Sequence, residues 1–101
     1  MSQTRQSWEP AREKDFFAAL AANKVVFTGQ YIVHGIIATN NGAAATTMTI
    51  SEMQGGAWTQ VGTLAVPIGA TVAFPIPSSG VLFNGLAVTP AAALDVTVLR
   101  T

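Results

Sequence analysis

The stretch Leu94-Asp95-Val96-Thr97-Val98 alternates apolar and polar side chains over five residues. Because successive side chains of a β-strand point to opposite faces of a sheet, this alternation predicts a strand whose three apolar side chains face a core. Residues 72–76 (Val-Ala-Phe-Pro-Ile) repeat the pattern, with the Val, Phe and Ile side chains expected to point inward. A protein whose clearest periodicity is two is predicted to be built from strands.

The same period extends over the whole chain from Val25 onward, where β-branched and aromatic residues are frequent. Residues that favour turns, mainly Asn, Gly, Pro and Ser, separate the apolar segments. We expect Asn84-Gly85 to form a bulge within its strand, and the prolines at 75 and 77 to mark an edge strand. The expected strands are Lys24–Thr28, Gln30–Thr39, Ala45–Met53, Ala57–Val66, Ala70–Ile76, Val81–Val88 and Leu94–Arg100.

Seven short strands with closely spaced turns predict an all-β body, an antiparallel β-sandwich or jelly roll, over residues 25–101. No helical pattern falls between the strands, which argues against a parallel α/β sheet. The chain of 101 residues is long enough for one packed core. It contains no cysteine, so disulfides, thiol nucleophiles and zinc–thiolate sites are excluded.

The segment before the body, residues 1–24, has a different pattern. Pro10 suits the first turn of a helix, and Ala11–Ala22 is rich in helix-forming residues. Phe16 and Leu20 are four residues apart and would share one helix face. The sequence therefore predicts an N-terminal arm with one short helix, whose Phe face packs either on its own body or on a neighbouring subunit.

Charged residues make up 10% of the chain, and seven of the ten fall within the first 24 positions. The net charge is zero, which removes the electrostatic signature of a nucleic-acid or membrane-surface binder. Two interpretations of the weakly charged body stay open. It is either a Thr-rich sheet protein that covers itself with small polar residues, or a body mostly surrounded by other protein. We favour the second interpretation.

The sequence offers little catalytic chemistry. His34 is the single histidine, and it lies between Val and Ile residues of an expected strand, so we expect a structural role for it. A Ser-His-Asp set can be written with Ser51, Ser78 or Ser79, but no nucleophile-elbow motif accompanies any of them. We therefore expect no catalytic residue, no cofactor and no metal site, and a protein that is not an enzyme.

Three aromatic residues have two interpretations each. Trp58 and Tyr31 either pack in the core or at a subunit contact, or stack on sugars as in carbohydrate-binding sandwiches. Trp8 lies in the charged arm, where it is either an anchor on a partner surface or a hydrophobic staple on its own helix.

Three segments of the body resemble small β-sandwich virion proteins of tailed bacteriophages. They are residues 69–74 (Gly-Ala-Thr-Val-Ala-Phe), 80–89 (Gly-Val-Leu-Phe-Asn-Gly-Leu-Ala-Val-Thr) and 94–99 (Leu-Asp-Val-Thr-Val-Leu). The resemblance covers roughly residues 25–101 and contains strand positions but no site residues. It implies a non-enzymatic capsid decoration (cement) protein of the virion, assembled in the host cytoplasm. It further implies a homotrimer that binds the major capsid protein or another virion protein.

In this interpretation the arm attaches the protein to its partner, because it carries most of the charged groups and an aromatic anchor. The alternative is a receptor- or carbohydrate-binding module of a phage fibre or tail component. Neither function involves nucleic acid or a membrane. The expected partner-binding residues are Trp8, Arg5, Arg12, Phe16 and Phe17.

Overall fold

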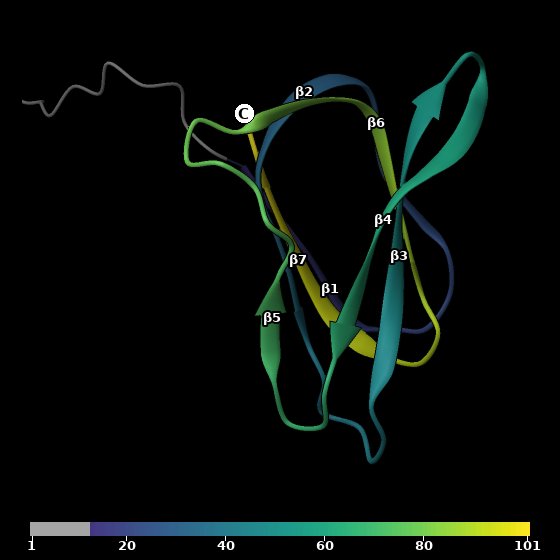
Figure 1. Cartoon of the computed structure of the whole chain (residues 1–101), viewed down its shortest axis with the longest axis vertical. Coiled ribbons are helices and arrows are strands. Elements are labelled where there is room, and N and C mark those ends of the chain that lie inside the picture. Colours follow the sequence, from purple (N-terminus) through teal and green to yellow (C-terminus); the bar gives the residue numbers. More distant parts are fainter. Residues whose placement is uncertain (1–12) are drawn as a thin grey trace, which may run out of the picture.

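The computed structural model describes residues 13–101, and these form one antiparallel sheet of seven strands (Figure 1). The strand order is β1-β7-β2-β6-β3-β4, with β5 paired to β2 outside this path. The all-β class predicted from the period of two is confirmed. The strands are β1 (Glu13–Leu20), β2 (Lys24–Thr39), β3 (Thr46–Gln54), β4 (Ala57–Val66), β5 (Thr71–Ala73), β6 (Val81–Pro90) and β7 (Leu94–Arg100).

Strand β2 joins the two parts of the sheet. Its first part, Lys24–Val33, pairs with β6, whereas its second part, Val33–Thr39, pairs with β7 on one side and includes the residues that pair with β5. Gly29 adopts a φ of 84°, and the β2–β6 register is irregular around it. The two strands predicted at 24–28 and 30–39 are therefore one strand with an irregularity between them.

The core contains side chains from both parts of the sheet, so the sheet is folded over its own inner face. The apolar residues of 94–98 are at most 1% exposed, and Val72, Phe74 and Ile76 pack against the same core, as their alternation predicts. Burial of these side chains supplies the main driving force for folding. The buried cluster consists of Phe27, Val33, Ile36, Ala38, Met48, Ile50, Leu64, Val66, Phe83, Leu86, Val88, Leu94, Val96 and Val98.

The predicted N-terminal helix is wrong where the structure describes the chain. Residues 13–20 form the edge strand β1, which pairs with β7 from Glu13 opposite Arg100 to Leu20 opposite Leu94. Local helix propensity is worth well under 1 kcal/mol per residue, so a ladder of backbone hydrogen bonds and the burial of apolar side chains outweigh it. The start of the predicted helix lies outside the described residues.

Two local predictions agree with the structure. Strand β6 continues through Asn84-Gly85, where Gly85 has a φ of 79° opposite the irregular stretch of β2, so this pair marks a bulge and not a reversal. Strand β5 is only three residues long, pairs with β2 alone, and is followed by Pro75, as expected of an edge strand.

Candidate protein-interaction surface

The structure does not bring the sequence-predicted partner residues together. Arg5, Trp8 and Arg12 lie outside the described residues. Phe16 and Phe17 are neighbours on a strand, so their side chains point to opposite faces of the sheet. Phe16 is 56% exposed, whereas Phe17 packs against the core, with the Lys24 amine 5.6 Å from its ring centre.

The charged groups at the start of β1 surround Arg100. The guanidinium of Arg100 donates to the Asp15 carboxylate at 2.9 Å and lies 3.1 Å from Glu13. It also stacks 4.3 Å from the Tyr31 ring centre and 5.5 Å from that of Phe27. The hydrogen bond with Asp15 raises the pKa of Arg100 above its usual value. These contacts fasten β1 to β7 and β2, which is a structural role.

His34 also has structural contacts. It lies where the β2–β7 register shifts between Val33 and Gly35, and its Nε2 is 3.3 Å from the Thr101 hydroxyl. Its Nδ1 is buried without a hydrogen-bond partner among residues 13–101. In the same part of the chain, no hydrogen bond joins His34 to a carboxylate or a serine. The hydrogen bonds of this part of the chain therefore do not join His34 into the Ser-His-Asp set written from the sequence.

The opposite end of the molecule is a surface of small, uncharged residues, which we call the loop end. It consists of three turns, 41–45, 67–69 and 91–93, and all eleven of these residues are exposed. Six of them are alanines and none carries a charge. A surface without charged side chains loses little hydration energy when it is covered by another protein.

Two polar side chains fix the 41–45 turn of the loop end in place. Asn40, which is 1% exposed, donates through Nδ2 to the carbonyls of Ala44 and Val66 and accepts from the Gly42 amide through Oδ1. It thereby ties the 41–45 turn to the end of β4. Asp95 accepts from the Asn41 side chain at 2.8 Å and from the Ala19 amide at 2.8 Å, so both of its oxygens are used within the molecule.

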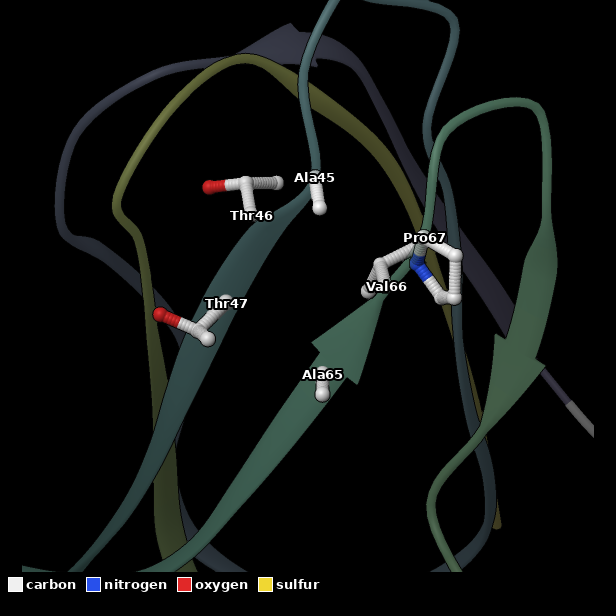
Figure 2. Close-up of a pocket in the computed structure, with 6 residues that line it drawn as sticks. All are labelled: Ala45, Thr46, Thr47, Ala65, Val66 and Pro67. Atoms are coloured by element: carbon white, nitrogen blue, oxygen red, sulfur yellow. The ribbon is translucent and has the colours of Figure 1, made fainter.

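A shallow apolar depression of about 250 Å³ lies between the adjoining ends of β3 and β4 (Figure 2). It borders two turns of the loop end. The Ala91 amide donates to the Thr47 carbonyl at 2.8 Å, which places the third turn beside it. The lining residues are Ala45, Thr46, Thr47, Ala65, Val66 and Pro67.

Ile68 stands next to this depression and is 60% exposed. The Ala70 amide donates to the Pro67 carbonyl at 3.1 Å, so residues 67–70 form a four-residue turn with Ile68 at its second position. Gly69 at the third position has a φ of 71°, as a type II turn requires. This turn presents the Ile68 side chain to solvent.

A second exposed feature is the β3–β4 hairpin, which projects beyond β6 (Figure 1). β6 pairs with β3 only as far as Ser51, whereas the hairpin continues to Gln54 opposite Ala57. Trp58 in this projection is 38% exposed and covers Gly85, where an added Cβ would lie 3.2 Å from the indole. One part of the Trp58 ring therefore packs on Gly85, and the rest is exposed to solvent.

None of the comparisons with protein-family models, curated proteins and solved structures gives a match. Residues 13–101 contain no cluster of three potential metal ligands. The described part of the chain also has no helix long and apolar enough to cross a bilayer. The sequence analysis did not identify the loop end, although its signal was present as three short charge-free segments, two of them rich in alanine.

Proposed function

We propose that this chain is a non-enzymatic structural protein of a virus particle, namely a capsid decoration protein with a jelly-roll-like sandwich. The loop end is the observation that carries the proposal. It is exposed and uncharged, and hydrogen bonds of Asn40 and Asp95 hold its 41–45 turn in place. A preorganised surface loses little conformational entropy on binding. On a lattice, many weak contacts of this kind between neighbouring copies add up to a stable layer.

The two ends of the molecule support different contacts in this proposal. Four of the charged residues in the described part, Glu13, Lys14, Asp15 and Arg100, lie at the end opposite the loop end. The sequence before Glu13 contains Arg5, Trp8 and Arg12. We assign attachment to the capsid to this N-terminal segment, and contact with further copies of the chain to the loop end.

The test uses virus particles that encode this chain. Particles prepared without the protein should bind the added full chain saturably, with a fixed number of copies per capsid subunit. Electron microscopy should then show its density at repeated lattice positions. Absence of the chain from purified particles, together with no binding of the added protein, would contradict the proposal.

Carbohydrate binding is the second candidate, and the exposed indole of Trp58 on a projecting hairpin favours it. A glycan array would show a signal that Trp58→Ala removes and Trp58→Phe, which keeps an aromatic ring, largely retains. The decoration function predicts no such signal.

A further inference from the structure

Ile68 is a large apolar side chain held out into solvent by its turn. The Ile68 residue is 60% exposed. Covering its side chain with another surface would remove apolar area from water, which is favourable. The Gly69 conformation and the hydrogen bond between Ala70 and Pro67 fix the turn, and the Gly69 amide is further bound to the Asn40 carbonyl at 3.0 Å. The side chain is therefore presented from a rigid support, as a knob.

The depression beside it has the size and chemistry of a receptor for such a knob. An apolar cavity of about 150 Å³ is enough to hold benzene, which has six carbons. The depression of about 250 Å³ therefore has room for the four-carbon side chain of an isoleucine. Pro67, which lines the depression, is the residue directly before Ile68, so the knob starts at the rim of the depression.

We infer that the loop ends of two copies of this chain pair about a two-fold axis, with Ile68 of each copy inserted in the depression of the other. A two-fold contact requires a self-complementary patch, and an adjacent knob and depression provide one. In such a contact each charge meets the same charge near the axis, so the absence of charged residues from the three turns removes this repulsion. The inference rests on the self-association included in the proposed function.

The experiment measures the mass of the full chain by light scattering and sedimentation between about 10 μM and about 1 mM, the range of a weak contact. We expect a reversible dimer. Ile68→Asp should raise its dissociation constant at least about a hundredfold, because two buried isoleucines are lost. Leu82→Asp is the matched control, since Leu82 is 58% exposed on β6 and the change adds the same charge. It should leave the dissociation constant within about twofold.

A second variant addresses the depression instead of the knob. Ala65 is exposed on β4 and lines the depression, and Ala65→Phe should fill it and weaken the dimer without disturbing a strand position. Mixing Ala65→Phe with Ile68→Ala should restore part of the association, because the intact Ile68 of one variant fits the open depression of the other. Thermal melts of every variant would show that the fold is retained.

Three outcomes would overturn the inference: a wild-type monomer throughout the range, a dimer that survives Ile68→Asp, or a trimer. The trimer implied by the resemblance and the two-fold dimer are thus distinguished by mass. Binding of the chain to particles is measured separately. A chain that decorates particles without Ile68-dependent pairing would keep the proposed function and contradict only this contact.

Discussion

Asn40 shows how one side chain can hold a turn against a neighbouring strand. It follows directly after β2, is 1% exposed, and satisfies two carbonyls and one amide through its carboxamide. Alanine and glycine residues around it have no side-chain polar groups of their own. The 41–45 turn is therefore held by the carboxamide of Asn40. The same group donates a hydrogen bond to the buried Val66 carbonyl at the end of β4.

Asn40→Ala should lower the free energy of unfolding by about 2–3 kcal/mol, because the buried Val66 carbonyl and two partly buried backbone groups lose their hydrogen bonds. Asn41→Ala is the neighbouring control. It removes one exposed hydrogen bond to Asp95 and should cost below about 1 kcal/mol. Urea denaturation of both variants measures the difference. Equal costs would show that the Asn40 contacts do not hold the turn.

Arg100 stabilises the junction of three strands through a charged hydrogen bond and two aromatic contacts. Arg100→Gln should cost about 1–2 kcal/mol, since the side chain is only 15% exposed. Because the pKa of Arg100 is raised on folding, its contribution is complete below the unfolded pKa and is lost only as the pH rises through the folded one.

The cost of Arg100→Gln should therefore be constant between about pH 7 and about pH 10, a range entirely below the arginine pKa. Lys14→Gln removes the same charge from an exposed position on β1 and serves as the control. Urea titrations across this range test the expectation. A loss of the Arg100 effect within it would contradict the assigned cause.

At the scale of elements, β1 is where sequence and structure differ most. The i, i+4 spacing of Phe16 and Leu20 is real, but Phe17 and Leu20 are the residues that pack against the core. A register shift between Phe17 and Leu20, with Ala19 at a φ of 48°, allows both to face inward from a strand. Such an irregularity cannot be read from local periodicity, because it depends on the pairing with β7.

Strand and helix make different predictions for the two phenylalanines. In the strand, Phe17→Ala should lower the free energy of unfolding by about 2 kcal/mol or more, because a core contact is lost. Phe16→Ala, on the exposed face, should cost below about 1 kcal/mol. Chemical denaturation of both variants compares them, and a larger effect at Phe16 would argue for the helix.

The other elements could be predicted well, for physical reasons that differ among them. Strands β4 and β7 match their predicted bounds, since strong alternation and clear turn residues define both ends. The expected strand at 70–76 shortens to β5 because its prolines cannot donate to a ladder. The loop end was not predicted, because its three turns are far apart in sequence and only the topology brings them together.

At the scale of the whole molecule, two truncations separate the role of β1 from that of the residues before it. Removal of residues 1–12 should leave the stability nearly unchanged, because it keeps the whole of β1 (Glu13–Leu20) and its pairing with β7. Removal of residues 1–22 should destabilise the fold, since it deletes the edge partner of β7 and the core contacts of Phe17 and Leu20. Thermal melts of the two truncated chains measure this contrast, and similar melting temperatures would contradict it.

The shorter truncation also tests attachment to particles. It should reduce occupancy on capsids while the body stays folded, and Trp8→Ala should reduce occupancy more than Arg5→Ala. Aromatic anchors at interfaces typically contribute about 2 kcal/mol or more, whereas exposed ion pairs contribute about 0–1 kcal/mol. Unchanged occupancy with a folded body would remove the N-terminal segment from the attachment surface.

The projecting β3–β4 hairpin has a practical consequence. Its tip, Gly55-Gly56, is exposed, and both glycines have positive φ without close neighbours around them. Exposed tips of this kind accept inserted sequences with little cost to the fold. The tip also lies apart from the loop end and from the start of β1. A peptide epitope or affinity tag genetically fused between Gly55 and Gly56 should therefore be displayed outward, which would make the chain a carrier for antigens.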